Sequence, residues 1–88
     1  MKVAFDAIAW ADLTWWIGQP EPQSRKVLKL IEEIRRTPRN GTGHPERLKH
    51  FDTELWSRRV NLVHRIVYEI DGDKITFLQL RGHYWFDR

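Results

Sequence analysis

The sequence predicts an α+β fold, in which two helices pack against an antiparallel sheet. Apolar residues recur at helical spacing up to about position 36, and strand-like segments fill positions 55–81. A loop punctuated by glycine and proline separates the two regions. Helices and strands segregated along a chain form one helical layer on one sheet. The 88 residues, 41% of them hydrophobic, suffice for the core of one domain, 1–88.

A short strand and two helices are expected in the first half. Residues 3–5 form the strand, and Asp6 is a natural N-cap for a helix over 7–17 that ends at Gly18. The prolines of the QPEPQ segment can begin a helix but not continue one. A second helix therefore follows and ends before Pro38.

One side of each helix is expected to face the core. The apolar residues at helical spacing are Ala9, Leu13, Trp16 and Ile17 in the first helix and Val27, Leu28, Ile31 and Ile34 in the second. The other side of the second helix is charged.

Three strands are expected in the second half, which gives the order β-α-α-β-β-β. Residues 55–60 and 62–70 have strand character, with period-two alternation in the second segment. Asp71-Gly72-Asp73 signals a hairpin turn. Residues 74–81 form the last strand, whose apolar residues on both faces favour a position inside the sheet.

Positive charge is concentrated in the middle of the chain. Residues 24–65 contain 11 Lys/Arg and 5 Asp/Glu, although the formal net charge is only +3. Clustered cations attract phosphates, so this pattern favours a nucleic acid partner. A solvated helix face with scattered surface charge is the alternative.

The composition argues against metal and membrane sites. Cysteine is absent, which excludes disulfides and thiolate ligands, and the four histidines match no zinc spacing. We therefore expect no metal and no cofactor. Two aspartates interrupt the apolar N-terminal stretch, and no run is long enough to span a membrane. A cytoplasmic protein is expected.

A carboxylate among cations is the first candidate for chemistry. Glu46 lies in a stretch with Arg47, Lys49, Arg58, Arg59 and Arg65. A carboxylate near cations stays ionised and can accept a proton, although an ordinary surface ion pair is the alternative. Neighbouring strand residues point to opposite faces, so only one of Arg58 and Arg59 can share a surface with Arg65.

A histidine near the end of the last strand is the second candidate. His83, beside Tyr84, titrates near neutrality and can protonate a leaving oxygen, although a packing role is the alternative. Base, acid and cations together suit RNA cleavage, in which the 2′-hydroxyl is the nucleophile. DNA, which lacks that hydroxyl, would resist.

Three stretches of sequence carry a family resemblance. RRTPRNGTGHPERLKH, WSRRVNLVHRIVYEI and LRGHY closely resemble the YoeB (Txe) branch of the RelE toxin superfamily. The resemblance implies a RelE-like fold and ribosome-dependent cleavage of mRNA in the ribosomal A site, which inhibits translation. It assigns the general base to Glu46, the phosphate-stabilising arginine to Arg65, the general acid to His83 and an aromatic role to Tyr84.

Further contacts and partners follow from the same resemblance. Residues expected to contact RNA or phosphate are Lys49, Trp56, Arg58 and Arg59. An antitoxin of the YefM (Phd) type, the ribosome and mRNA are the expected partners, with a homodimer or a toxin–antitoxin hetero-oligomer as the assembly. The alternatives are a non-catalytic RNA- or ribosome-binding module and a corepressor subunit of an antitoxin complex.

Overall fold

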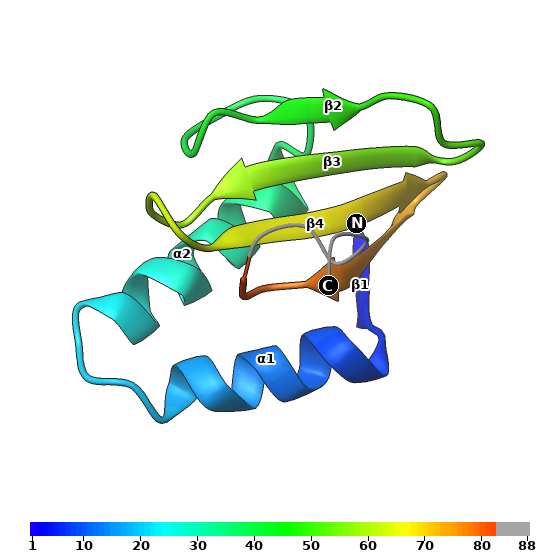
Figure 1. The fold of residues 1–88 in the computed structure, drawn as a ribbon. Helices are drawn as coiled ribbons and strands as arrows, with labels where there is room; N and C mark the ends of the chain where they lie inside the picture. Colours follow the sequence, from blue (N-terminus) through cyan, green and yellow to red (C-terminus); the bar gives the residue numbers. More distant parts are fainter. Residues whose placement is uncertain (83–88) are drawn as a thin grey trace.

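Both helices lie on one face of a five-stranded sheet (Figure 1). The computed structural model describes residues 1–82. The elements in chain order are β1 (Lys2–Phe5), α1 (Ala7–Ile17), α2 (Gln23–Arg36), β2 (Glu46–Leu48), β3 (Glu54–Arg59), β4 (Arg65–Asp71) and β5 (Lys74–Gln79). The strand order across the sheet is β1-β5-β4-β3-β2. The predicted α+β class is therefore confirmed.

The helices begin and end close to where the sequence predicts. The Asp6 side chain accepts a hydrogen bond from the Ala9 N–H at 3.0 Å, and Gly18 ends α1. The fully or nearly buried apolar residues of the two helices are Ala9, Trp16, Val27, Leu30 and Ile34. Ile17 and Leu28, expected on the buried sides, are 61% and 49% exposed. Each lies about 100° around its helix from the buried residue before it.

The sheet contains pairings that the sequence does not predict. β2 is an additional three-residue strand that pairs antiparallel with β3. β1 runs parallel to β5, so the sheet is mixed rather than wholly antiparallel. β5 consequently lies between β1 and β4, which confirms the interior position expected from its two apolar faces.

The connections on either side of β4 differ in how well they were predicted. Asp71 pairs with Lys74 across Gly72, whose φ is 57°, and this confirms the hairpin turn. Residues 62–64, expected in a strand, lie in a loop. There the Asn61 Oδ1 accepts hydrogen bonds from the backbone N–H groups of residues 63 and 64, at 2.9 and 2.8 Å. These N–H groups therefore bond to a side chain and not to a neighbouring strand.

The sheet has an apolar cluster on each face. The main core lies under the helices and includes Ile66, Tyr68 and Phe77. A smaller cluster of Leu48, Leu55 and Val67, with Leu78 packed against it, lies on the opposite face because its members alternate with the core residues. We call this opposite face the open face, since neither α1 nor α2 covers it (Figure 1).

Candidate functional site

Glu46, Arg59 and Arg65 lie together at one end of the open face. Glu46 pairs with Ser57, and Arg59 pairs with Arg65, so alternation puts all three on the same side of the sheet. Direct cross-strand partners lie about 4.5–5.5 Å apart and diagonal ones about 7–8 Å. The Gly82 backbone oxygen accepts the Arg65 N–H at 2.8 Å. His83 therefore follows directly from a residue beside Arg65.

The two arginines make this end of the face suitable for an anion. Like charges directly opposite each other on a sheet are destabilising. The Arg65 Nη1 donates to the backbone oxygens of Asn61 at 2.9 Å and of His64 at 3.3 Å, which orients the guanidinium. Arg59 is exposed. A phosphate over this pair would accept hydrogen bonds from both guanidinium groups and offset their repulsion.

The other predicted site residues fall in two groups. Glu46 and Lys49 are exposed and line a shallow depression along the edge strand β2. Lys49 is therefore within the same surface as the base candidate. His83 and Tyr84 lie outside the described residues, so their roles remain predictions from the sequence.

Arg58 is wrongly predicted as an RNA contact. Its side chain lies on the helical face and is 0% exposed. The guanidinium donates to the Glu33 carboxylate at 2.8 Å and to the Tyr68 hydroxyl at 3.2 Å. It also donates to backbone oxygens of the loop before β2, those of Thr37, Asn40 and Thr42. Arg58 therefore holds the loop that leads to Glu46.

Trp56 also lies on the helical face, on the far side of β3 from Arg59. It packs against the main core, and its indole Nε1 donates to Glu54 at 2.8 Å. Trp56 therefore does not share the open face with the arginine pair, and its contact with RNA stays a prediction from the sequence. Arg39 donates two hydrogen bonds to the same carboxylate, at 2.7 and 2.9 Å. The hydrogen bonds from Arg39, which has the larger effect, and from Trp56 lower the pKa of Glu54 to about 2.

The lowered pKa of Glu54 predicts a loss of stability in acid. Because the folded-state pKa of about 2 lies below the ordinary 4.5, the carboxylate stabilises the fold above pH 4.5. That contribution is lost as the pH falls from 4.5 towards 2. Urea denaturation at pH 6 and pH 3 should show a Glu54→Gln penalty at pH 6 that shrinks at pH 3. Arg39→Met should show the same trend, and a penalty equal at both pH values would contradict it.

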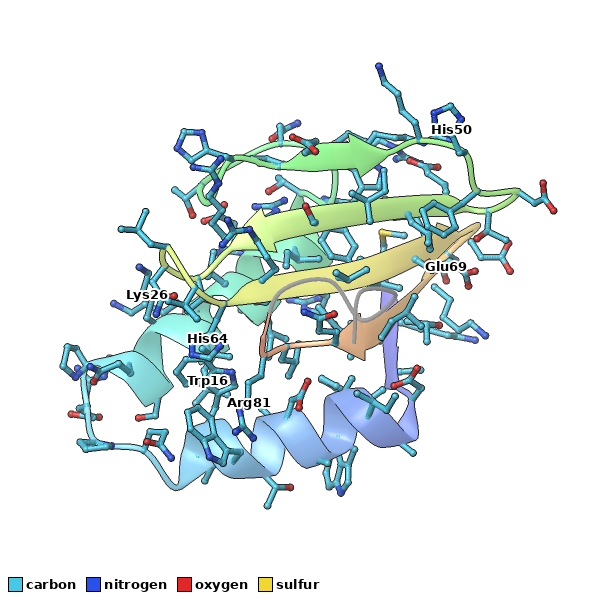
Figure 2. All side chains as sticks on the ribbon, in the orientation of Figure 1. Trp16, Lys26, His50, His64, Glu69 and Arg81 are labelled. Carbon is cyan, nitrogen blue, oxygen red and sulfur yellow. The ribbon has the colours of Figure 1, made fainter. Side chains whose placement is uncertain are left out.

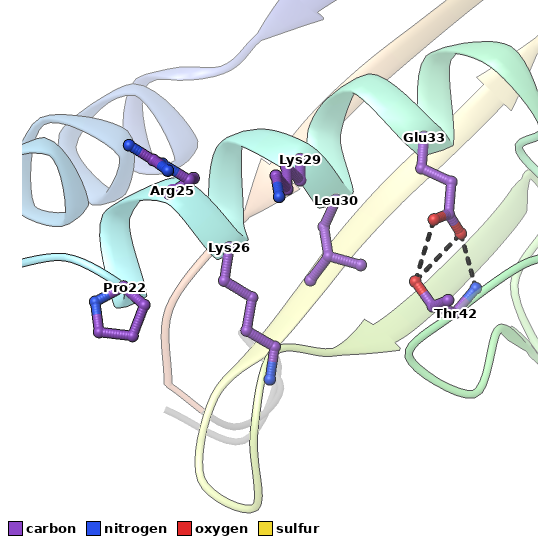
Figure 3. A pocket seen from close by; sticks show the side chains of 7 residues that line it. All are labelled: Pro22, Arg25, Lys26, Lys29, Leu30, Glu33 and Thr42. Atoms are coloured by element: carbon purple, nitrogen blue, oxygen red, sulfur yellow. Dashed lines mark hydrogen bonds between the residues drawn. The ribbon is translucent and has the colours of Figure 1, made fainter.

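A cationic surface lies along α2, and Figure 3 shows its cations on the helix. Arg25, Lys26 and Lys29 line a pocket of about 350 Å³ that Thr42 also borders. Lys26 lines a neighbouring pocket of about 350 Å³ together with Arg59. Lys26 thus connects the α2 surface to the arginine pair. This surface was not predicted as part of the site, although its cations lie three and four residues apart, the spacing of one helix face.

The described residues offer no metal cluster and no membrane helix. Within residues 1–82, no group of three or more histidine and acidic side chains could hold a metal ion. In that same part of the chain, neither helix is long and apolar enough to cross a bilayer.

Comparison with known proteins assigns the chain to a family. A family model described as the YoeB-like toxin of bacterial type II toxin–antitoxin systems matches residues 5–84. The chain belongs to the YoeB toxin family. Among its YoeB relatives, Toxin YoeB of Mycobacterium bovis is 40% identical over 83 residues, covering 94% of this chain and 98% of that protein.

Solved YoeB structures have the same fold. The YoeB/ParE toxin from Agrobacterium tumefaciens superposes with a TM-score of 0.86 at 35% identity, covering 96% of this chain and all of that one. The YoeB dimer from Staphylococcus aureus gives 0.82 at 30% identity, and YoeB in that organism's heterotetrameric YoeB–YefM complex gives 0.80. Each covers 96% of this chain and 98% of that chain. An archaeal RelE from Pyrococcus horikoshii, only 17% identical, shares the fold with a TM-score of 0.70.

The family match also covers the part of the site that lies outside the described residues. The YoeB family model extends to residue 84 and so includes His83 and Tyr84 as well as Glu46 and Arg65. The resemblance seen in the sequence is therefore confirmed for the family. The chemical role of each residue stays a prediction.

Proposed function

We propose that this chain is a ribosome-dependent endoribonuclease that cleaves mRNA in the ribosomal A site and so inhibits translation. The observation that carries the proposal is the row formed across one end of the open face by Glu46, Arg59 and Arg65. Beside Arg65 lies Gly82, whose backbone oxygen accepts a hydrogen bond from the Arg65 N–H and which precedes His83 in the sequence. A candidate base and two cations thus lie on three neighbouring strands, next to the residue that precedes His83 along the chain.

The proposed reaction needs only the RNA and these side chains. Glu46 takes the proton of a 2′-hydroxyl, whose oxygen attacks the adjacent phosphorus. Arg65 and Arg59 stabilise the extra negative charge on the phosphorane. The bond to the 5′-oxygen breaks as His83 donates a proton to that oxygen. The products are a 2′,3′-cyclic phosphate and a free 5′-hydroxyl, and Tyr84 is assigned an aromatic contact to the substrate.

The shape and charge of the site support a substrate presented by a larger partner. Glu46 and Arg59 are exposed, so the described chain does not enclose the scissile phosphate. The ribosome would hold the mRNA and supply the orientation on which such catalysis depends. Lys49 and the cations of α2, which extend the positive surface around Arg59, would contact RNA phosphates. Action on ribosomes places the protein in the cytoplasm.

A protein antitoxin is the proposed physiological inhibitor. The related toxin from S. aureus forms a complex with YefM and has also been solved as a dimer. By that likeness we assign this chain an antitoxin of the YefM (Phd) type and a homodimer or toxin–antitoxin hetero-oligomer. The arginine pair and the neighbouring cations of α2 favour an acidic antitoxin segment that folds on binding.

Cleavage of mRNA on programmed ribosomes tests the proposal. The upstream fragment should end in a 2′,3′-cyclic phosphate or its 3′-phosphate hydrolysis product, and the downstream fragment should begin with a 5′-hydroxyl. The same mRNA without ribosomes should stay intact. A single 2′-deoxy substitution at the scissile position should abolish cutting, because it removes the nucleophile. A 5′-phosphate on the downstream fragment would contradict the mechanism, and ribosome binding without cleavage would favour a non-catalytic module.

A further inference from the structure

The segment that leads to His83 is held largely by side chains, beyond the end of the last strand. β5 ends at Gln79, earlier than the expected residue 81. The Leu80 N–H donates to the Asp12 Oδ2 at 3.0 Å, and the Leu80 carbonyl oxygen accepts from the Trp16 Nε1 at 2.7 Å. Both side chains come from α1 and are buried. The helix therefore fixes the backbone at the end of the last strand.

Gly82, the residue before His83, is bound at both of its backbone groups. Its N–H donates to the His64 Nδ1 at 2.9 Å. Its carbonyl oxygen accepts from the Arg65 N–H at 2.8 Å and from the Gln79 Nε2 at 3.1 Å. Its φ of 83° lies in the left-handed region, where glycine is favoured. The Gly82 N–H thus depends on one imidazole nitrogen for its partner.

The His64 ring is held in place by α1. It packs edge-on against Trp16 at 5.1 Å between centroids and lies 6.0 Å from Trp15. The Arg81 guanidinium lies over the Trp15 ring at 3.9 Å (Figure 2 shows His64, Trp16 and Arg81 in one cluster). His64 also borders a depression of about 240 Å³, so protons can reach it. The ring is therefore fixed in orientation but able to titrate.

We propose that His64 is a positioning residue, whose neutral imidazole anchors the Gly82 N–H and so fixes the backbone from which His83 continues. An acceptor Nδ1 requires the neutral ring with its proton on Nε2. Protonation of the ring adds a hydrogen to Nδ1, which then faces the Gly82 N–H as a donor. Two donors cannot bond to each other, so the anchor is lost. The effect on catalysis rests on the proposed role of His83, whereas the anchor itself does not.

The charges around His64 favour the neutral, anchoring form. Burial, and then the positive charge of Arg81, lower the pKa of His64 below its ordinary value, while Asp12 acts in the opposite direction. Trp15, Trp16 and Gly82, which also contact the ring, carry no charge. The anchor is therefore formed at neutral pH and is released in acid, as His64 takes up a proton.

Two substitutions separate the acceptor from the bulk of the ring. In His64→Asn the amide oxygen can take the place of Nδ1 and does not titrate, whereas His64→Leu fills similar space with no acceptor. Cleavage on programmed ribosomes should fall by about tenfold in single-turnover rate for His64→Leu, with ribosome binding unchanged, because the Gly82 N–H is left without its partner. His64→Asn should stay within about twofold of the wild type.

Hydrogen exchange at the Gly82 amide tests the anchor without any assay of function. In the full-length protein this amide should be protected at pH 7 and lose protection as His64 protonates, beyond the intrinsic pH dependence of exchange. His64→Asn should keep the protection both at pH 7 and in acid, and His64→Leu should lack it at either pH. Trp16→Phe, which removes the bond to Leu80 but keeps an aromatic ring beside His64, should retain the pH dependence that His64 confers.

The outcomes separate this inference from the proposed function. Equal Gly82 protection in the wild type and His64→Leu, or loss of protection in His64→Asn, would overturn the anchor. A wild type that fails to cleave, yet shows the expected exchange pattern, would contradict the function and leave the anchor standing. Cleavage by His64→Leu at the wild-type rate would show that the anchor does not position the acid.

Discussion

Replacing Glu46 with glutamine, or Arg65 with alanine, is expected to lower the cleavage rate on programmed ribosomes by about 10²-fold or more. Glutamine keeps the shape of the side chain but cannot accept the 2′-hydroxyl proton. Alanine at position 65 removes the guanidinium that offsets the charge on the phosphorane. Both losses act in the transition state, so they should lower the single-turnover rate far more than the affinity for ribosomes. Expression of either variant without antitoxin should no longer arrest growth.

Matched controls exist on the same strands. Glu69 lies on the open face of β4 beside Leu55, away from the arginine pair, so Glu69→Gln should cleave at the wild-type rate. Arg47 neighbours Glu46 on β2 but points to the other face, where it pairs with Trp56. Arg47→Ala therefore tests whether any lost cation on this edge has the same effect. Normal toxicity from a well-folded Glu46→Gln protein would remove the base assignment.

The parts of the fold that the sequence predicts well are fixed by residues close to one another along the chain. Asp6 caps the helix that begins at the next residue, and Gly72 allows the φ of 57° that the β4–β5 hairpin requires. Such signals do not depend on what the rest of the chain does. The parallel pairing of β1 with β5 joins residues about 70 positions apart, and no local pattern carries that information.

β2 shows why an element beside the site was missed. Its three residues, Glu46–Leu48, contain a single buried side chain, Leu48. Nothing in so short a polar segment indicates a strand. It is extended because β3 supplies hydrogen-bonding partners and because Leu48 packs into the cluster on the open face. Glu46 could be predicted as a candidate base, but its place beside Arg59 depends on this pairing.

The opposite sides of Arg58 and Arg59 also required the structure. Alternation shows that only one of the two can share a face with Arg65, but β3 has an apolar residue of each parity, Leu55 and Trp56. Its pattern therefore does not reveal which parity faces the helices. The ambiguity is resolved by the register with β4, in which Arg59 pairs with Arg65.

The structural role of Arg58 leads to the second large effect, on stability. Arg58→Ala is expected to lower the free energy of unfolding by about 3 kcal/mol, the lower end of the range for breaking a buried ion pair. The low end applies because the Glu33 side chain is 27% exposed and regains water, whereas Arg58 is fully buried. Each kcal/mol corresponds to about 4–8 °C in Tm for a domain of this size. Urea and thermal denaturation of the purified protein measure the loss.

A comparison with the adjacent residue decides whether Arg58 acts through stability. The guanidinium of Arg58 provides partners for backbone oxygens of the loop before β2, which a lysine ammonium at the same position cannot match in number or geometry. Arg58→Lys should therefore lie between Arg58→Ala and the wild type. Arg59→Ala, exposed on the open face, should change stability by less than about 0.5 kcal/mol while lowering cleavage. If Arg58→Ala instead had the stability of the wild type and still failed to cleave, Arg58 would have to be reassigned as a direct contact to RNA.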